Sequence, residues 1–119
     1  MEVFAAFAIV RHWDGRIWAT TREDGSIGLP GGKLEQGEDV IDAARREARE
    51  EGLAIRALEA RVVRVAEVEG KPVAWVEFVF AEAHRLDEYK EQHRGIRPII
   101  VPVADVAAGF GNEFLLEAA

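Results

Sequence analysis

One acidic segment with fixed spacing constrains this chain more than any other feature. Within Leu29–Glu51, Glu47 lies three residues before Glu50 and four before Glu51. A helix places these carboxylates on one face, where like charges repel. They also stand just before Gly52, a typical helix stop, where the helix dipole disfavours anions. A bound divalent cation would remove both penalties, because hard cations bind clustered carboxylate oxygens.

The spacing of this segment resembles the Nudix box, the loop-helix signature of the Nudix hydrolases. The family's pattern is a glycine, five residues, a glutamate, seven residues, Arg-Glu, an apolar residue, any residue, Glu-Glu, any residue and a glycine. One residue of that pattern is missing, because Gly52 follows Glu51 directly, and this predicts a helix that ends one residue early. The positions in register are Gly32, Glu38, Arg46, Glu47, Ala48, Glu50 and Glu51.

The resemblance implies a site for Mg²⁺ or Mn²⁺. It assigns Glu47, Glu50 and Glu51 as metal ligands, with the carbonyl of Gly32 facing the metal. The competing interpretation is a solvated acidic helix face, which is the usual meaning of a charge run. Arg46 would hold a glutamate of the box, Glu47 first, by an ion pair.

Two further roles stay open between alternatives. Glu38 either binds metal through water or complements the helix N-terminus. In many relatives the catalytic base is a glutamate of the box, such as Glu50, or one in a later loop. Glu91 is the candidate in the polar stretch from Leu86 to Gly95, ahead of Glu88 and His93, and a solvated loop glutamate is an equal alternative.

Two residues are candidates for substrate binding. Arg22 ends a predicted strand just before the box, where arginine suits a substrate phosphate; a surface arginine is the alternative. Asn112 is the only asparagine, and the Gly-Asn-Glu sequence around it resembles the end of the oxidised-purine nucleotide pyrophosphohydrolases, where an asparagine reads the purine edge. Its favoured alternative is an N-cap for the last helix.

Bulk properties narrow the class of protein. With 119 residues, we expect one domain spanning residues 1–119. The net charge of −7 argues against non-specific binding of nucleic acid, and the absence of cysteine excludes disulfides and zinc-finger spacing. No apolar run is long enough for a membrane span, and the N-terminus lacks signal-peptide features, so a cytoplasmic protein is expected.

Hydrophobic periodicity and turn residues predict the order of the elements. An Asp14-Gly15 hairpin joins the first two strands, Asp39 caps the box helix, and residues 30–37 form a loop. This order suits an α/β fold, specifically the Nudix-type α/β/α sandwich with a mixed sheet. The predicted strands are Val3–Arg11, Arg16–Arg22, Ala60–Val68, Pro72–Glu82 and Ile99–Val103, and the predicted helices are Val40–Glu51 and Asn112–Glu117.

The resemblance implies metal-dependent hydrolysis of a nucleoside diphosphate linked to another group. A nucleoside triphosphate or modified nucleotide is the leading substrate, as in MutT-like enzymes. Nucleotide sugars and dinucleoside polyphosphates are alternatives, and so is a non-catalytic nucleotide sensor. A homodimer stays open, because many relatives dimerise.

Overall fold

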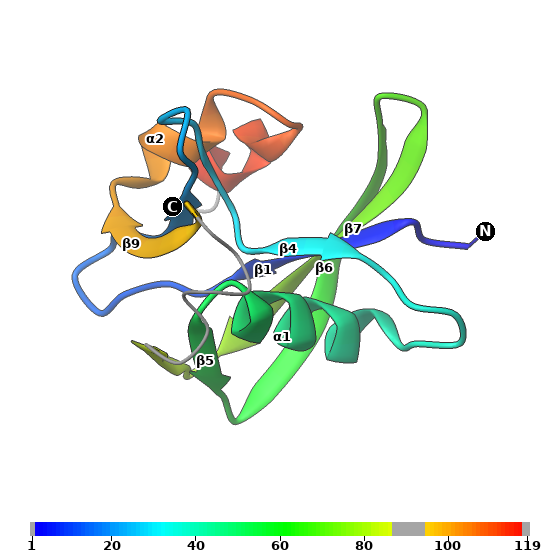
Figure 1. Ribbon diagram of the computed structural model, residues 1–119, viewed down its shortest axis with the longest axis horizontal. Helices are drawn as coiled ribbons and strands as arrows, with labels where there is room; N and C mark the ends of the chain where they lie inside the picture. Colours follow the sequence, from blue (N-terminus) through cyan, green and yellow to red (C-terminus); the bar gives the residue numbers. More distant parts are fainter. Residues whose placement is uncertain (1, 87–94, 118–119) are drawn as a thin grey trace.

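The computed structural model describes residues 2–86 and 95–117, which form a mixed α/β fold (Figure 1). The polar stretch that carries Glu88, Glu91 and His93 lies outside the described residues. No helix in the described part of the chain has the length and apolar character needed to cross a membrane. The elements are β1 Ala5–Ile9, β2 Ile17–Thr21, β3 Ile27–Gly28, β4 Gly31–Lys33, α1 Val40–Glu50, β5 Leu53–Arg56, β6 Glu59–Val68, β7 Lys71–Val79, β8 Glu82–Arg85, β9 Arg97–Val101, α2 Val103–Ala107 and the 3-10 helix η2 Asn112–Glu117.

The central sheet is mixed and has the strand order β4-β1-β7-β6. Strand β1 pairs in parallel with β7 and antiparallel with β4, while β6 and β7 form an antiparallel hairpin. A second sheet has the order β3-β2-β9, and β5 pairs with β8. Helix α1 covers one face of the central sheet, and α2 with η2 lies on the opposite side (Figure 1).

The side-chain alternation of β1 explains this layering. Ala5 and Ile9 belong to the core beneath α2 and η2, and Ala6 and Ala8 belong to the core beneath α1. On α1, the residues packed against the sheet are also small, namely the fully buried Ala43, Ala44 and Ala48. Small residues on both surfaces let the helix approach the sheet closely, which brings its polar edge next to β4.

The box helix begins at Val40, as predicted, and ends at Glu50, one residue before the predicted end at Glu51. Asp39 accepts hydrogen bonds from the backbone N–H groups of Ile41 and Asp42 at 2.9 and 3.3 Å. The helix stops at Glu50, and Gly52 has φ +95°, a left-handed conformation that glycine adopts without strain.

Three predictions about the elements need correction. The Asp14-Gly15 turn forms, but β1 and β2 belong to different sheets and share only the bridge between Arg11 and Ile17. Residues 31–33 of the predicted loop form β4, because their backbone pairs with β1. The predicted strand Pro72–Glu82 stops at Val79, since Phe80 has φ +51° and turns the chain. The predicted terminal helix Asn112–Glu117 forms with these bounds, as a 3-10 helix.

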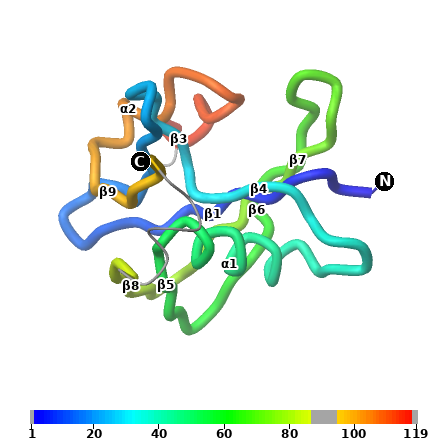
Figure 2. The backbone as a smooth tube through the Cα atoms, in the orientation of Figure 1, coloured from blue at the N-terminus to red at the C-terminus, as the bar shows by residue number. Residues whose placement is uncertain are grey.

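At the Phe80 end of the β6–β7 hairpin, β5 comes before β6 in the chain and β8 follows β7. These two short strands also pair with each other. Arg56 is opposite Glu82 in one pair of strands, and Glu59 is opposite Val79 in the other. Strands β5 and β8, like α2, were not predicted from the sequence. At its other end, the β6–β7 hairpin extends beyond the neighbouring strands β1 and β4, as the backbone trace shows (Figure 2).

Candidate active site

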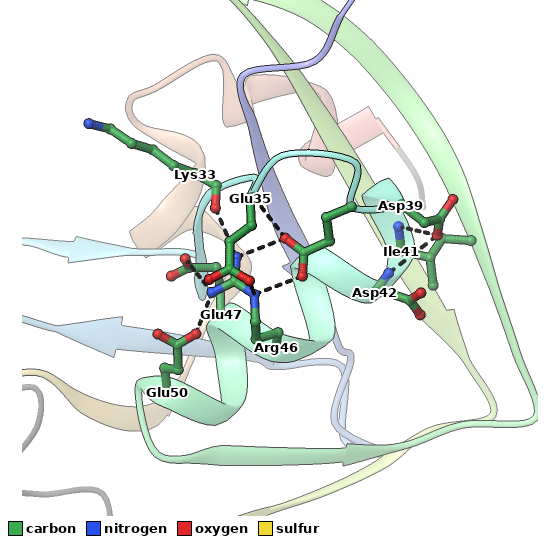
Figure 3. Close-up of polar contacts among 9 residues, drawn as sticks. Lys33, Glu35, Asp39, Ile41, Asp42, Arg46, Glu47 and Glu50 are labelled. Carbon is green, nitrogen blue, oxygen red and sulfur yellow. Dashed lines mark hydrogen bonds and ion pairs between the residues drawn. The ribbon is translucent and has the colours of Figure 1, made fainter.

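Arg46 is the centre of the polar cluster between α1 and β4. Its Nε and Nη2 donate to the two carboxylate oxygens of Glu38 at 2.7 and 2.9 Å, a bidentate pair. Its Nη1 donates to Glu47 Oε1 at 3.0 Å and to Glu50 Oε2. Nη2 also donates to the Lys33 carbonyl at 2.9 Å (Figure 3). One guanidinium therefore joins the box loop, the strand β4 and two turns of α1.

The electrostatics of the cluster follow from these contacts. The hydrogen bonds from Arg46 are the main reason why the pKa of Glu38 is lowered. In turn, Glu38 makes the largest contribution to raising the pKa of Arg46. Glu35 adds an outer ion pair, with its Oε1 3.6 Å from Arg46 Nε. Arg46 is therefore the cation that the Glu35, Glu38, Glu47 and Glu50 side chains share.

Glu51 has a different environment from the other box glutamates. It is only 6% exposed, and its Oε1 accepts a hydrogen bond from the Gly31 N–H at 3.1 Å. The pKa of Glu51 is raised to about 7, mainly by burial and to a lesser extent by the charges of Glu47 and Glu50, against the lowering effect of the Gly31 hydrogen bond and of the Arg22 charge. A carboxyl group with this pKa exchanges its proton near neutral pH.

Gly32 lies in direct contact with Glu47. A Cβ at position 32 would be 2.5 Å from Glu47 Oε2 and 2.7 Å from its Cδ. Only glycine leaves room for the carboxylate there, so β4 and α1 fix the position of Glu47 between them.

The donors at this site have the chemistry of a hard-cation site. Glu47, Glu50 and Glu51 are carboxylates from one end of α1, and Glu51 is buried with a partly compensated charge. Magnesium and manganese prefer such oxygen donors. Among the described residues, no three acidic or histidine side chains converge on one point as they stand. Arg46 holds Glu47 and Glu50, so both carboxylates would turn away from the guanidinium to bind an ion.

A pocket of about 480 Å³ lies on the other side of the central sheet from α1, and Arg22, Leu29, Val106, Phe110 and Asn112 are among the residues that line it. The lining residues with polar side chains are Arg22, Ser26, Asp105 and Asn112. Arg22 connects this pocket with the box, because its charge acts on Glu51. We call this the Arg22 pocket.

Comparison with known proteins decides the family. The model of the NUDIX domain matches residues 1–115. The chain belongs to the Nudix hydrolase family. No curated protein matches it significantly.

Solved Nudix structures share the fold of this Nudix hydrolase at low sequence identity. A MutT Nudix hydrolase from Burkholderia pseudomallei superposes with a TM-score of 0.68 and 23% identity, covering 98% of both chains. MutT from Bacillus halodurans gives 0.66 and 20%, covering 95% of this chain and 78% of that one. A MutT structure from work on Aliivibrio salmonicida and Vibrio cholerae gives 0.64 and 24%, covering 87% and 82%.

Most of the site residues expected from the sequence lie together in this Nudix hydrolase. Arg46 does pair with Glu47, as expected, but its bidentate partner is Glu38. Arg22 and Asn112 share a pocket, although 90 residues separate them in sequence. Glu91 lies outside the described residues.

The structure also shows contacts that the sequence analysis missed. The Asn112 side chain does not cap η2 in the expected way: Oδ1 accepts from Trp75 Nε1 at 2.8 Å, and Nδ2 donates to the Val106 carbonyl at 3.1 Å. The Gly31 N–H and the Lys33 carbonyl contribute backbone hydrogen bonds to the site. No signal in the sequence marks the hydrogen bonds of the Gly31 N–H and the Lys33 carbonyl, because they depend on how β4 lies against α1.

Proposed function

We propose that this Nudix hydrolase cleaves a nucleoside diphosphate linked to another group, with a nucleoside triphosphate or a modified nucleotide as the leading substrate and Mg²⁺ or Mn²⁺ as the cofactor. The observation that carries the proposal is the arrangement of Glu47, Glu50 and Glu51 around Arg46 and Gly31 at the end of α1. Three neighbouring carboxylates at the C-terminal end of a helix repel one another and oppose the helix dipole, and a bound cation would offset both effects.

Each residue has a distinct proposed role. Glu47, Glu50 and Glu51 hold the cation, together with the Gly32 carbonyl, and Glu50 also acts on the attacking water. The bound cation would neutralise charge on the diphosphate and lower the pKa of water. Glu91 is the alternative base. Arg46 orients Glu47 and Glu50 and holds the loop that carries Glu38.

The Arg22 pocket is the proposed nucleoside site. The guanidinium of Arg22 can donate two parallel hydrogen bonds to a phosphate. Asn112 uses one Nδ2 proton and one Oδ1 lone pair inside the protein, so one donor and one acceptor remain for a ligand. Such a pair can read the edge of a base, and the apolar side chains of Leu29 and Val106 can cover its faces.

Turnover by the purified protein tests this proposal. Anion-exchange chromatography quantifies the nucleotide products formed from nucleoside triphosphates, oxidised nucleotides, nucleotide sugars and dinucleoside polyphosphates, with Mg²⁺, with Mn²⁺ and with EDTA. Glu50→Gln should lower kcat by about 100-fold or more, because it removes one charged group from the reacting centre. Glu59→Gln is the matched control, since Glu59 is an exposed residue at the start of β6.

The outcomes separate the alternatives. Metal-dependent turnover that Glu50→Gln abolishes and Glu59→Gln leaves intact supports the proposal and names the substrate. Absence of turnover on every substrate, together with a metal-induced rise in melting temperature, would contradict it and favour a nucleotide sensor.

A further inference from the structure

A second pocket, of about 370 Å³, lies next to the Arg22 pocket on the same side of the central sheet. Among the described residues, Phe7 and Phe110 are the two that line both pockets, and their rings meet edge to face with centroids 5.0 Å apart. The wall between the pockets is therefore this pair of rings. We call the second one the Phe4 pocket, and the residues that define it are Phe4, Phe7, Lys33, Lys71, Val73 and Phe110.

The two rings of this wall are held very differently. Phe7 lies in β1, a strand that is paired on both sides, opposite Gly31 of β4 and Trp75 of β7. Its ring lies against Gly31, where an added Cβ would be 2.5 Å from Cδ1 of Phe7. Phe110 belongs to the loop between α2 and η2, and its side chain is 44% exposed. Phe7 is therefore the fixed side of the wall, and Phe110 is the side that can move.

Phe110 has a backbone conformation that its side chain does not favour. The Asn112 N–H donates to the Gly109 carbonyl at 3.0 Å, which closes a turn with Phe110 and Gly111 at its centre. Both central residues have positive φ, +55° and +72°. Turns of this kind are dominated by glycine, asparagine and aspartate, because a larger side chain is strained there. A strained residue that lines a pocket points to a role for its side chain in that pocket.

The glycines on either side of Phe110 are not equivalent. A Cβ added at Gly111 would lie 3.4 Å from Trp75 Cη2, and the next residue, Asn112, is buried and bonded to Trp75. At Gly109, nothing lies within 4 Å of an added Cβ, and φ is outside the left-handed range. The turn is thus anchored after Phe110 and free before it, so that Gly109 can act as the hinge.

We propose that Phe110 is a gate between the two pockets and sets the size of the group that the Arg22 pocket admits. While its ring lies against Phe7, the two pockets are separate. When the ring swings away about Gly109, they join into one groove, and Phe4 and Val73 offer an apolar surface to an extension of the bound group. The identity of that group rests on the proposed function, whereas the movement of the ring does not.

Binding of two monophosphates measures the size limit. AMP and N6-benzyl AMP contain no diphosphate to cleave, and the benzyl group is the apolar extension. If the open gate is populated to about 10%, the affinity for N6-benzyl AMP is lowered about tenfold by that fraction. Phe110→Ala should therefore raise the ratio of the two affinities, N6-benzyl AMP over AMP, about tenfold in calorimetry. Phe80→Ala is the matched control, because Phe80 is also an exposed phenylalanine at positive φ but lines neither pocket.

Fluorine NMR follows the gate without any ligand. A para-fluorinated phenylalanine replaces the six phenylalanines, and Phe110→Leu assigns one signal by its loss. Relaxation dispersion should show exchange of Phe110 on the microsecond to millisecond scale, and Gly109→Ala should suppress it by restricting the hinge. The signal of the buried Phe78 should show no exchange.

These readouts separate the gate from the proposed function. Failure of the wild type to bind either monophosphate would count against the proposed nucleoside site, and the NMR measurement would still decide whether the ring moves. Exchange at Phe110 with a raised affinity ratio in Phe110→Ala supports the gate. A Phe110 signal without exchange, or an affinity ratio that Phe110→Ala leaves unchanged, would overturn it.

Discussion

The carboxylate of Glu47 occupies the space that a side chain at position 32 would need, since a Cβ on Gly32 would lie 2.5 Å from Glu47 Oε2. The contact joins Gly32, the glycine that begins the box pattern, to Glu47, the first glutamate of the box helix. It explains in physical terms why a glycine is needed 15 residues before that glutamate.

Gly32→Ala should therefore damage the site more than the fold. We expect Glu47 to be displaced, Mg²⁺-induced stabilisation to be lost, and kcat/KM to fall by about 100-fold, because small displacements of catalytic groups cost about that much. Differential scanning calorimetry with and without Mg²⁺ measures the first effect. Gly28→Ala is the control for metal binding, since nothing lies within 4 Å of its added Cβ. Full metal-induced stabilisation in Gly32→Ala would contradict the role of this contact.

Arg46→Lys tests whether geometry or charge holds the cluster together. Lysine keeps the charge but cannot make the bidentate pair with Glu38 while also reaching Glu47 and Glu50. We expect a loss of about 1–3 kcal/mol in the free energy of unfolding and a clear fall in kcat. Urea denaturation and steady-state kinetics measure them. Arg45→Lys, on the same helix and stacked over Phe78, should change little; equal effects of both substitutions would refute the argument.

The buried Glu51 predicts an unusual dependence of stability on pH. Its pKa is raised from 4.5 to about 7 in the folded protein. Between these values the unfolded chain has released the proton and the folded chain has kept it, so metal-free stability falls as pH rises through this window. The loss attributable to Glu51 is about 3 kcal/mol. Urea denaturation in EDTA from pH 4 to 8 should show it.

Glu51→Gln isolates this contribution, because glutamine does not titrate. The difference in unfolding free energy between wild type and variant should change with pH through this window and level off above it. In the wild type, the affinity for Mg²⁺ should rise from pH 5 to 7, since binding displaces the proton. A difference that stays constant with pH would show that Glu51 titrates normally.

Trp75→Phe should loosen the Asn112 amide. The substitution removes the donor that holds Asn112 Oδ1 at 2.8 Å in a buried position. We expect a cost of about 1–3 kcal/mol for the unsatisfied carbonyl, and a reduced preference among bases in the proposed nucleoside site. Trp18→Phe is a matched control for tryptophan loss in the other core. If the Trp75→Phe variant keeps the base preference of the wild type, Asn112 does not contribute to the choice of base.

Local patterns were enough to predict the box. Asp39 caps α1 and Gly52 ends it because these signals act within a few residues. The helix in turn dictates that Glu47, Glu50 and Glu51 share one end of it, and the mixed α/β fold follows from the order of the elements.

The burial of a side chain and the identity of its hydrogen-bond partner could not be predicted from local patterns. Nothing local distinguishes Glu51 from Glu50, yet only Glu51 is buried, because β4 passes over it. The partner of Asn112 is Trp75, 37 residues away, in a strand on the far side of the core. The end of β7 at Val79 was missed because the positive φ of the next residue, Phe80, is unusual for an aromatic residue.

The anchoring of Asn112 has a consequence for how this protein can change over evolution. Its amide is tied to β7 through Trp75 and to α2 through Val106, so altering it disturbs the core. Phe110, which lines the same pocket, is 44% exposed and lies between two glycines. Variants with new ligand preferences should therefore arise first at Phe110, whose side chain is anchored less deeply, and Asn112 should be among the last positions of the pocket to diverge.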